Sequence, residues 1–351
     1  MRAPDTRAPG ARASGVQERA AEVPDLTAAR TLGDLLALGE RATGSRQAAL
    51  WLVAGVLARC SGQDGSAPGP SAGPHAGPRA GPSIDRPNLQ ALRCRLGEQV
   101  EVEVARRVES AARRCAAGEP LQYVLGSWSF RGLEVALDAR VLIPRPETEQ
   151  VVEHALAELA ASAGRACPGE PMVVVDMGTG SGAIAMALAA EGPSRAGERE
   201  LRVWATDASA DTLELAGENF RDLVASCPGS APVELAEGSW FGALPAELAG
   251  RLALVVSNPP YVSEGEWEQL EPAVRDYEPR MALVAGEAGT EMIEAIVEKA
   301  GRWLAPWGAL VVEIAPHQAL FAAEAAHGAG FGEVEVLRDL AGRERVLVAR
   351  A

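Results

Sequence analysis

An amide, two prolines and a phenol ring follow one another at the end of an apolar run, in the stretch Asn258-Pro259-Pro260-Tyr261. Two successive prolines continue neither a helix nor a strand, so they make this corner stiff. The Asn258 side-chain oxygen and the Pro259 carbonyl can both accept hydrogen bonds from a planar NH2 group, and Tyr261 can stack on the π face of that group. Such a corner would align a weakly nucleophilic amide or amino-purine nitrogen and stabilise its developing charge. A structural turn without chemistry is the alternative.

A second candidate site is the glycine-rich turn in the stretch Val173–Ala189, VVVDMGTGSGAIAMALA. Gly178, Gly180 and Gly182 fill the turn between a predicted buried strand, which ends at Asp176, and a predicted helix. Glycines there permit tight dihedral angles and let a ligand touch the backbone. The G-x-G-x-G spacing differs from the dinucleotide fingerprint, and no lysine follows as in a phosphate-binding P-loop. A packing turn without ligand is the alternative.

Two later strand ends add polar and aromatic candidates. Asp207 ends a predicted strand about 25 residues beyond the glycine turn, where an acid can accept hydrogen bonds from both ribose hydroxyls of a ligand. It could instead, or in addition, cap the helix that follows. Trp240 and Phe241 come just after the next predicted strand and could wall an adenine, although ordinary core packing is the alternative.

Strand and helix patterns alternate through the C-terminal part of the chain. This alternation predicts an α/β fold with a parallel, doubly wound sheet, whose carboxyl edge would gather the candidate residues. Strands are predicted at Met172–Met177, Leu201–Thr206, Val233–Ala236, Leu252–Val256, Ala309–Ile314, Val334–Leu337 and Arg345–Val348, and helices at Ala183–Glu191, Ala210–Leu223, Thr290–Leu304 and His317–His327.

The N-terminal part is mostly helical in pattern. Apolar spacing from Thr31 to Arg59 predicts two helices separated near Gly44, and a stripe starting after Asn88 predicts one long amphipathic helix ending near Ala117-Gly118. Alternating apolar residues then predict a β-hairpin with its turn at Arg131-Gly132, and Pro146 opens a further helix. Residues 1–25 read as a disordered tail, and 61–86 as a Gly/Pro-rich linker.

Composition narrows the classes of partner. The 351 residues are 47% hydrophobic, and the formal net charge of −15 disfavours nucleic acid as the main partner. No apolar run approaches the length of a membrane span, and no signal-peptide core follows Met1, so we expect a cytoplasmic protein without membrane contact. The five cysteines are scattered without a C-x-x-C pair, which favours reduced thiols over metal or disulfide roles.

Four motifs in fixed order resemble the PrmC/HemK family of class I S-adenosylmethionine-dependent methyltransferases, which act on a glutamine of peptide chain release factors. They are GEPLQYVLGSWSF (118–130), LIPRPETE (142–149), DMGTGSGAIA (176–185) and SNPPYV (257–262). The ordered set is highly specific, whereas Asn-Pro-Pro-Tyr alone is shared with enzymes that modify adenine or guanine amino groups.

The resemblance implies a seven-stranded mixed sheet, preceded by a small helical domain that docks the release factor (26–120, interrupted by the linker) and by a connecting β-hairpin (121–145). The catalytic domain would be 146–351. S-adenosylmethionine would be the cofactor and class 1 release factors the partners of an enzyme that acts as a monomer, without a metal. The implied cofactor-binding residues are Gly178, Thr179, Gly180, Ser181, Gly182, Asp207, Trp240 and Asn258.

The resemblance also implies that Asn258, Pro259, Pro260 and Tyr261 clasp the glutamine of a Gly-Gly-Gln motif, with Asn258, Pro259 and Tyr261 as catalytic residues. A nucleic-acid amino-group methyltransferase of the same Asn-Pro-Pro-Tyr type is the alternative function, and the acidity of the chain counts against it. A cofactor-binding scaffold without activity is a third hypothesis. The intact corner argues against that scaffold.

Overall fold

The computed structural model describes residues 31–61, 89–166 and 169–351, and these fall into two compact units with their boundary between Ser127 and Trp128. The predicted tail 1–25 and nearly all of the predicted linker 61–86 lie outside the described residues. Ser61, the first residue of that linker, is the last residue of a helix.

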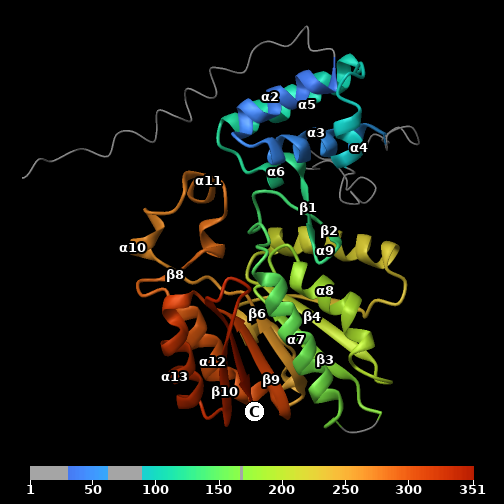
Figure 1. Cartoon of the computed structure of the whole chain (residues 1–351). Helices are drawn as coiled ribbons and strands as arrows, with labels where there is room; N and C mark the ends of the chain where they lie inside the picture. The colour runs from blue at the N-terminus through green and yellow to red at the C-terminus, as the bar shows by residue number, and fades with distance from the viewer. Residues whose placement is uncertain (1–30, 62–88, 167–168) are drawn as a thin grey trace, which may run out of the picture. The chain divides into compact units, whose positions relative to one another are not determined.

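The N-terminal unit is helical, as the apolar spacing predicts (Figure 1). A capping box between Thr31 and Asp34 starts helix α2, and Gly44 in the left-handed conformation ends it. Leucine, valine and alanine side chains from several helices form one buried cluster. The helices are α2 (Leu32–Thr43), α3 (Arg46–Ser61), α4 (Leu89–Cys94), α5 (Val102–Ala116) and α6 (Leu121–Leu125).

The prediction of one long helix ending near Ala117-Gly118 is wrong, because the chain breaks between α4 and α5. The carbonyl oxygens of Leu96 and Glu98 accept hydrogen bonds from the amides of Gly33 and Leu32, at 2.9 and 3.1 Å. Those two amides are at the start of α2, where they have no acceptor within their own helix. In a continuous helix the same carbonyls would accept hydrogen bonds from amides of that helix. The break instead lets them accept from the first amides of α2. Asn88, after which the predicted helix would start, lies outside the described residues.

A β-hairpin and a helix open the remainder of the chain. Strands β1 (Ser127–Phe130) and β2 (Leu133–Ala136) flank Arg131 and Gly132, whose φ angles of 49° and 80° fit a two-residue hairpin turn. Helix α7 (Thr148–Ala163) follows, with Glu147 as its N-cap residue.

The C-terminal unit is built on a seven-stranded sheet of order β10-β11-β9-β6-β3-β4-β5. Strand β11 is antiparallel to both neighbours, and the other pairs are parallel, so the sheet is mixed. The strands are β3 (Met172–Met177), β4 (Leu201–Asp207), β5 (Val233–Glu237), β6 (Leu252–Ser257), β9 (Leu304–Glu313), β10 (Glu333–Arg338) and β11 (Glu344–Arg350). Each predicted strand is present, with some ends shifted by a few residues.

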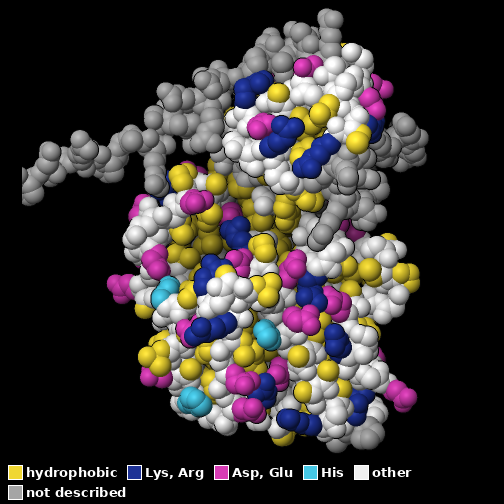
Figure 2. Space-filling model, in the orientation of Figure 1, with side chains coloured by type: hydrophobic (Ala, Val, Ile, Leu, Met, Phe, Trp, Pro, Cys, Tyr) yellow, Lys and Arg dark blue, Asp and Glu magenta, His cyan; other side chains and the backbone are white. Residues whose placement is uncertain are grey.

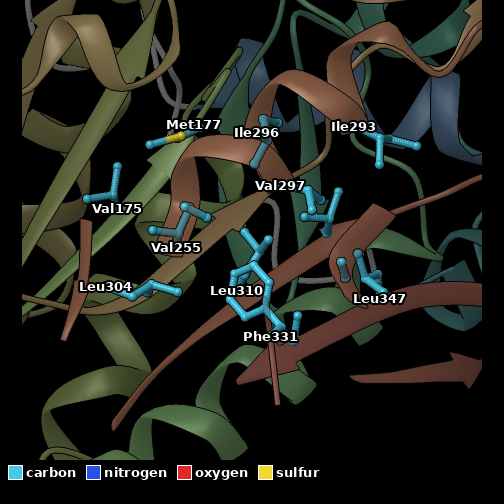
Figure 3. Close-up of a cluster of buried hydrophobic side chains, with 14 of the residues drawn as sticks. Val175, Met177, Val255, Ile293, Ile296, Val297, Leu304, Leu310, Phe331 and Leu347 are labelled. Atoms are coloured by element: carbon cyan, nitrogen blue, oxygen red, sulfur yellow. The ribbon is translucent and has the colours of Figure 1, made fainter. Parts of the chain in front are cut away.

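Helices cover both faces of this sheet (Figure 1). On one face α7 packs against β6 and β9, followed by α8 (Ala183–Glu191) and α9 (Ala210–Ser226); on the other, α12 (Glu291–Trp303) and α13 (Ala319–Gly328) pack against β9, β10 and β11. Figure 3 shows Ile293, Ile296 and Val297 of α12 gathered with Val255 and Leu310 of the sheet. This packed core fixes the sheet edge where the loops begin.

Hydrophobic periodicity did not predict the shortest elements. Strands β7 (Val262–Ser263) and β8 (Val284–Gly286) form a small parallel pair directly after the Asn-Pro-Pro-Tyr corner. Between β7 and β8 lie single turns of helix: α10 (Glu264–Trp267), α11 (Pro272–Arg275) and η4 (Arg280–Ala282). Elsewhere in the described residues the 3-10 turns are η1 (Gly192–Ser194), η2 (Trp240–Ala243), η3 (Ala246–Leu248) and η5 (Pro316–Gln318).

Candidate active site

The predicted site residues follow four neighbouring parallel strands at their carboxyl ends. The glycine turn comes after β3, Asp207 ends β4, Trp240 comes shortly after β5, and Asn258 comes directly after β6. In open α/β sheets this edge is where ligands bind.

All three glycines of the turn have positive φ angles, but their surroundings differ. Gly178, Gly180 and Gly182 have φ of 67°, 56° and 84°. A Cβ atom on Gly182 would lie 2.9 Å from the Phe220 ring of α9, so this glycine allows helix and turn to pack closely. A Cβ on Gly180 would meet no atom of the described residues within 4 Å. Gly180 therefore presents bare backbone to open space, as a ligand-binding turn requires.

The side chains between these glycines point inward. Thr179 is buried and donates a hydrogen bond to a carboxylate oxygen of Asp176 at 2.6 Å; the same oxygen accepts the Ala185 amide at 3.0 Å. Burial raises the pKa of Asp176 to about 7. Ser181 is buried and its carbonyl accepts from Asn219. Thr179 and Ser181 thus hold the turn in shape, and Asp176 is a supporting residue that sequence reasoning used only as a strand end.

Asp207 faces the glycine turn. One of its carboxylate oxygens accepts the Gly180 amide at 3.0 Å, and the other accepts the Ser209 amide at 3.0 Å. Burial raises the pKa of Asp207 above its usual range. The N-cap of α9 is Ser209, whose hydroxyl accepts the Thr212 amide. Asp207 therefore stands beside the open side of the turn rather than at the cap position.

Trp240 and Phe241 have different surroundings, although they are adjacent in sequence. Phe241 is buried and stacks on Trp303 of α12, with ring centroids 5.6 Å apart, so it belongs to the core. Trp240 is half-buried, has a φ of 48°, and lies with its ring against Gly178: a Cβ there would be 3.8 Å from the indole. The structure thus brings Gly178, Gly180, Asp207 and Trp240 together, and Phe241 packs in the core.

The two ends of the Asn258 side-chain amide differ in their hydrogen bonds. Its amide nitrogen donates to the Thr148 hydroxyl oxygen at 3.3 Å, and that hydroxyl donates to Glu313 at 2.7 Å. The Asn258 amide oxygen is buried and has no hydrogen-bond partner among the described residues. A buried acceptor left without a partner is costly. It is therefore a candidate acceptor for a donor group of a ligand.

Asn258 also lines a cavity of about 170 Å³. Its lining includes Asn258, Pro259, Tyr261 and Arg145, and the other lining residues are apolar: Leu142, Val262, Leu270, Val274, Ala282 and Leu283. Burial, as the largest cause, raises the pKa of Tyr261 to about 12, so its phenol stays neutral at physiological pH. Pro260 follows as a half-buried residue of the same corner.

The cavity and the corner depend on residues that sequence reasoning missed. Arg145, which lines the cavity, forms an ion pair with the buried Glu278 at 2.6 Å. Thr148 lies within the quoted LIPRPETE motif, yet spacing alone gave no sign that it meets Asn258, 110 residues away. Glu313 offered one weak signal, a charged residue within a predicted buried strand.

Among the residues that the structure describes, no helix is long and apolar enough to cross a membrane. Nor do the described ranges contain a group of three or more His, Cys, Asp or Glu side chains that could hold a metal ion.

A mixed seven-stranded sheet with β11 reversed, a glycine turn after β3 and an acid at the end of β4 define a class I methyltransferase. No family model matches the chain. Known relatives are more informative. The release factor glutamine methyltransferase of Burkholderia pseudomallei is 39% identical over 251 residues, which are 72% of this chain and 82% of the relative. That of Deinococcus radiodurans is 38% identical, covering 75% and 86%. The chain belongs to the release factor glutamine methyltransferase family.

The solved structures that match this chain share less sequence with it. A human methyltransferase 10 domain containing protein is 13% identical and covers 62% of this chain and 88% of its own, with a TM-score of 0.43. The ribosomal protein L11 methylase of Lactobacillus delbrueckii is 20% identical and covers 61% and 83%, with a TM-score of 0.38.

Proposed function

We propose that this protein transfers a methyl group from S-adenosylmethionine to the side-chain amide nitrogen of the glutamine in the Gly-Gly-Gln motif of class 1 peptide chain release factors. The single observation that supports this most is Asn258, which lines a largely apolar cavity and whose buried amide oxygen has no hydrogen-bond partner among the described residues. Family membership supports the same substrate, because the relatives are named for a release factor glutamine.

The cavity suits a glutamine side chain. Its apolar wall, which includes Leu142, Val274 and Leu283, can cover the two methylene groups, while Asn258 and the Pro259 carbonyl can accept the two N–H bonds of the terminal amide. Tyr261 can stack on the amide plane. The NH2 group of the ligand would also give the Asn258 oxygen the hydrogen bond that it lacks among the described residues.

The residues around the glycine turn fit the cofactor. Gly180 exposes bare backbone and Asp207 stands beside it, as a ribose with two hydroxyls requires, while Trp240 offers an aromatic wall. When bound, the cofactor supplies an electrophilic methyl group on a sulfonium sulfur. Gly178, Thr179, Gly180, Ser181, Gly182, Asp207, Trp240 and Asn258 are the proposed cofactor-binding residues.

Catalysis on this view is mainly positional. An amide nitrogen is a poor nucleophile because its lone pair is delocalised, and the neutral Tyr261 is not a base that could ionise it. Asn258 and Pro259 would orient the nitrogen and stabilise the positive charge that develops on it, while the apolar wall excludes water.

The distribution of charge favours a protein substrate over nucleic acid. On the face shown in Figure 2, acidic and basic side chains are interspersed over the part of the molecule that contains the sheet. With the net charge of −15, this gives no broad basic surface on that face for a phosphate backbone. We further propose that the enzyme acts as a monomer without stably bound nucleic acid, and that the helical region 26–120 docks the release factor while 146–351 catalyses.

The test uses the full chain with labelled S-adenosylmethionine and three acceptors: a class 1 release factor, the same factor with its Gly-Gly-Gln glutamine replaced by alanine, and nucleic acid. We expect label on the first acceptor alone, mapped by mass spectrometry to the amide nitrogen. Equal labelling of the two release factors would rule out the proposed substrate, and labelled nucleic acid would favour the alternative function.

A further inference from the structure

A chain of three side chains leads from the substrate corner into the interior of the C-terminal unit. Asn258 follows β6, Thr148 is the first residue of α7, and Glu313 is the last residue of β9. The amide nitrogen of Asn258 donates to Thr148 at 3.3 Å, and the Thr148 hydroxyl donates to Glu313 at 2.7 Å. Thr148 and Glu313 are only 3% and 1% exposed, so bulk water does not compete for these bonds.

The direction of these bonds matters, because an asparagine amide presents an acceptor at one end and donors at the other. A carboxylate only accepts, so an ionised Glu313 requires the Thr148 hydroxyl to donate to it. Thr148 then has only lone pairs to offer Asn258. The NH2 end of Asn258 must then face Thr148, which leaves the oxygen as the acceptor for a ligand; Asn258 lines the cavity, and this buried oxygen has no partner among the described residues.

We propose that Thr148 and Glu313 are positioning residues for methyl transfer, which fix the Asn258 amide with its oxygen toward the substrate nitrogen. This inference rests on the proposed function. Without the pair, the Asn258 amide could rotate and present its own NH2 group to the substrate NH2. Two donors would then face each other, and the alignment and charge stabilisation of the substrate nitrogen would be lost.

Protonation of Glu313 would weaken its hold on the orientation of the Asn258 amide. A protonated carboxyl can donate to Thr148, whose hydroxyl is then free to donate to Asn258 and select the wrong amide orientation. Burial raises the pKa of Glu313 to about 7. Arg345 and Arg145 favour the ionised form, whereas Glu147 opposes it; Tyr261 also faces this carboxyl and remains neutral. Turnover should therefore fall as pH decreases through about 7.

The experiment compares Thr148→Val, which keeps the shape but removes the hydroxyl, with Thr148→Ser, which restores it. Ser162→Ala is the matched control, because Ser162 is a buried residue at the far end of the same helix whose hydroxyl donates to the Trp307 carbonyl at 3.1 Å. Turnover of a release factor is measured with both substrates saturating, and folding is followed by thermal melting. Methylation by the wild-type protein first establishes the proposed function independently.

We expect Thr148→Val to lower kcat about tenfold or more, with Thr148→Ser and Ser162→Ala within about threefold of wild type. Equal turnover of Thr148→Val and Ser162→Ala would overturn the inference while leaving the proposed function intact. If Thr148→Val does not fold, Glu313→Gln decides the matter through its pH profile. We expect an acid limb near pH 7 in the wild type that is absent from Glu313→Gln; the same limb in both proteins would overturn the inference.

Discussion

The proposed cofactor side and the proposed substrate side of this site are held in shape by different means. On the cofactor side, backbone conformation dominates: three glycines with positive φ form the turn, and Asp176 and Asp207 brace it through backbone amides and one nearby hydroxyl. On the substrate side, side chains dominate. Asn258 depends on Thr148, and Thr148 on Glu313, which lies 165 residues further along the chain. Single substitutions should therefore separate cofactor binding from turnover.

The largest expected effect is on the substrate side. Asn258→Ala removes the acceptor oxygen, and we expect kcat to fall by about a hundredfold to a thousandfold, as when one preorganised polar group is lost from an active site. Single-turnover methylation of a release factor at saturating cofactor measures this. Asn258→Asp keeps an acceptor at the same place and should retain partial activity. Full activity of Asn258→Ala would mean that the corner has no part in the chemistry.

On the cofactor side, Asp207→Ala should weaken binding rather than turnover. Each lost charge-assisted hydrogen bond to the ribose is worth about 1.5–3 kcal/mol, so the Kd for S-adenosylmethionine should rise by at least about tenfold. Calorimetry on the full chain measures the affinity. Asp207→Asn is the comparison of equal size: it lacks the charge and has one acceptor oxygen, so it can accept from Gly180 or from Ser209 but not from both, and it should also weaken cofactor binding. An unchanged Kd in Asp207→Ala would remove this residue from the cofactor site.

The difference between backbone support and side-chain support also explains how much of the site the sequence could predict. Gly178, Gly180, Gly182 and Asp207 were predicted because a strand, a turn and the next strand encode them within a short stretch. Asn258 to Tyr261 were predicted because two prolines make the corner conspicuous. The contact of Thr148 with Glu313 was not predicted, because tertiary packing alone brings α7 and the end of β9 together. The break between α4 and α5 was missed for the same reason, because the hydrogen bonds that favour it lie in α2.

A smaller effect concerns stability and pH. The folded state binds the Glu313 proton more tightly than the unfolded chain does, because burial raises this pKa from 4.5 to about 7. Wild-type stability should therefore decrease as pH rises through that window, whereas Glu313→Gln has no such proton to lose. We expect the stability of the variant relative to wild type to increase by about 2 kcal/mol between about pH 5 and 7. Urea unfolding at several pH values measures this.

Asp176, whose pKa burial also raises to about 7, contributes with the same sign. It is present in both proteins of that comparison, so its contribution cancels in the difference. A constant difference across the pH range would show that Glu313 titrates in the folded protein as it does in the unfolded chain.

The smallest expected effect separates the ring of Tyr261 from its hydroxyl. The proposed role of this residue is to stack on the substrate amide, which requires only the aromatic face, and its raised pKa of about 12 keeps the phenol from acting as a base. Tyr261→Phe should therefore keep turnover within about threefold of wild type and leave the pH profile unchanged. Tyr261→Ala loses the face, so it should raise KM for the release factor about tenfold while the Kd for the cofactor stays the same. If Tyr261→Phe were as impaired as Tyr261→Ala, the hydroxyl would be the functional group, and the substrate side would need a proton acceptor in addition to its positioning side chains.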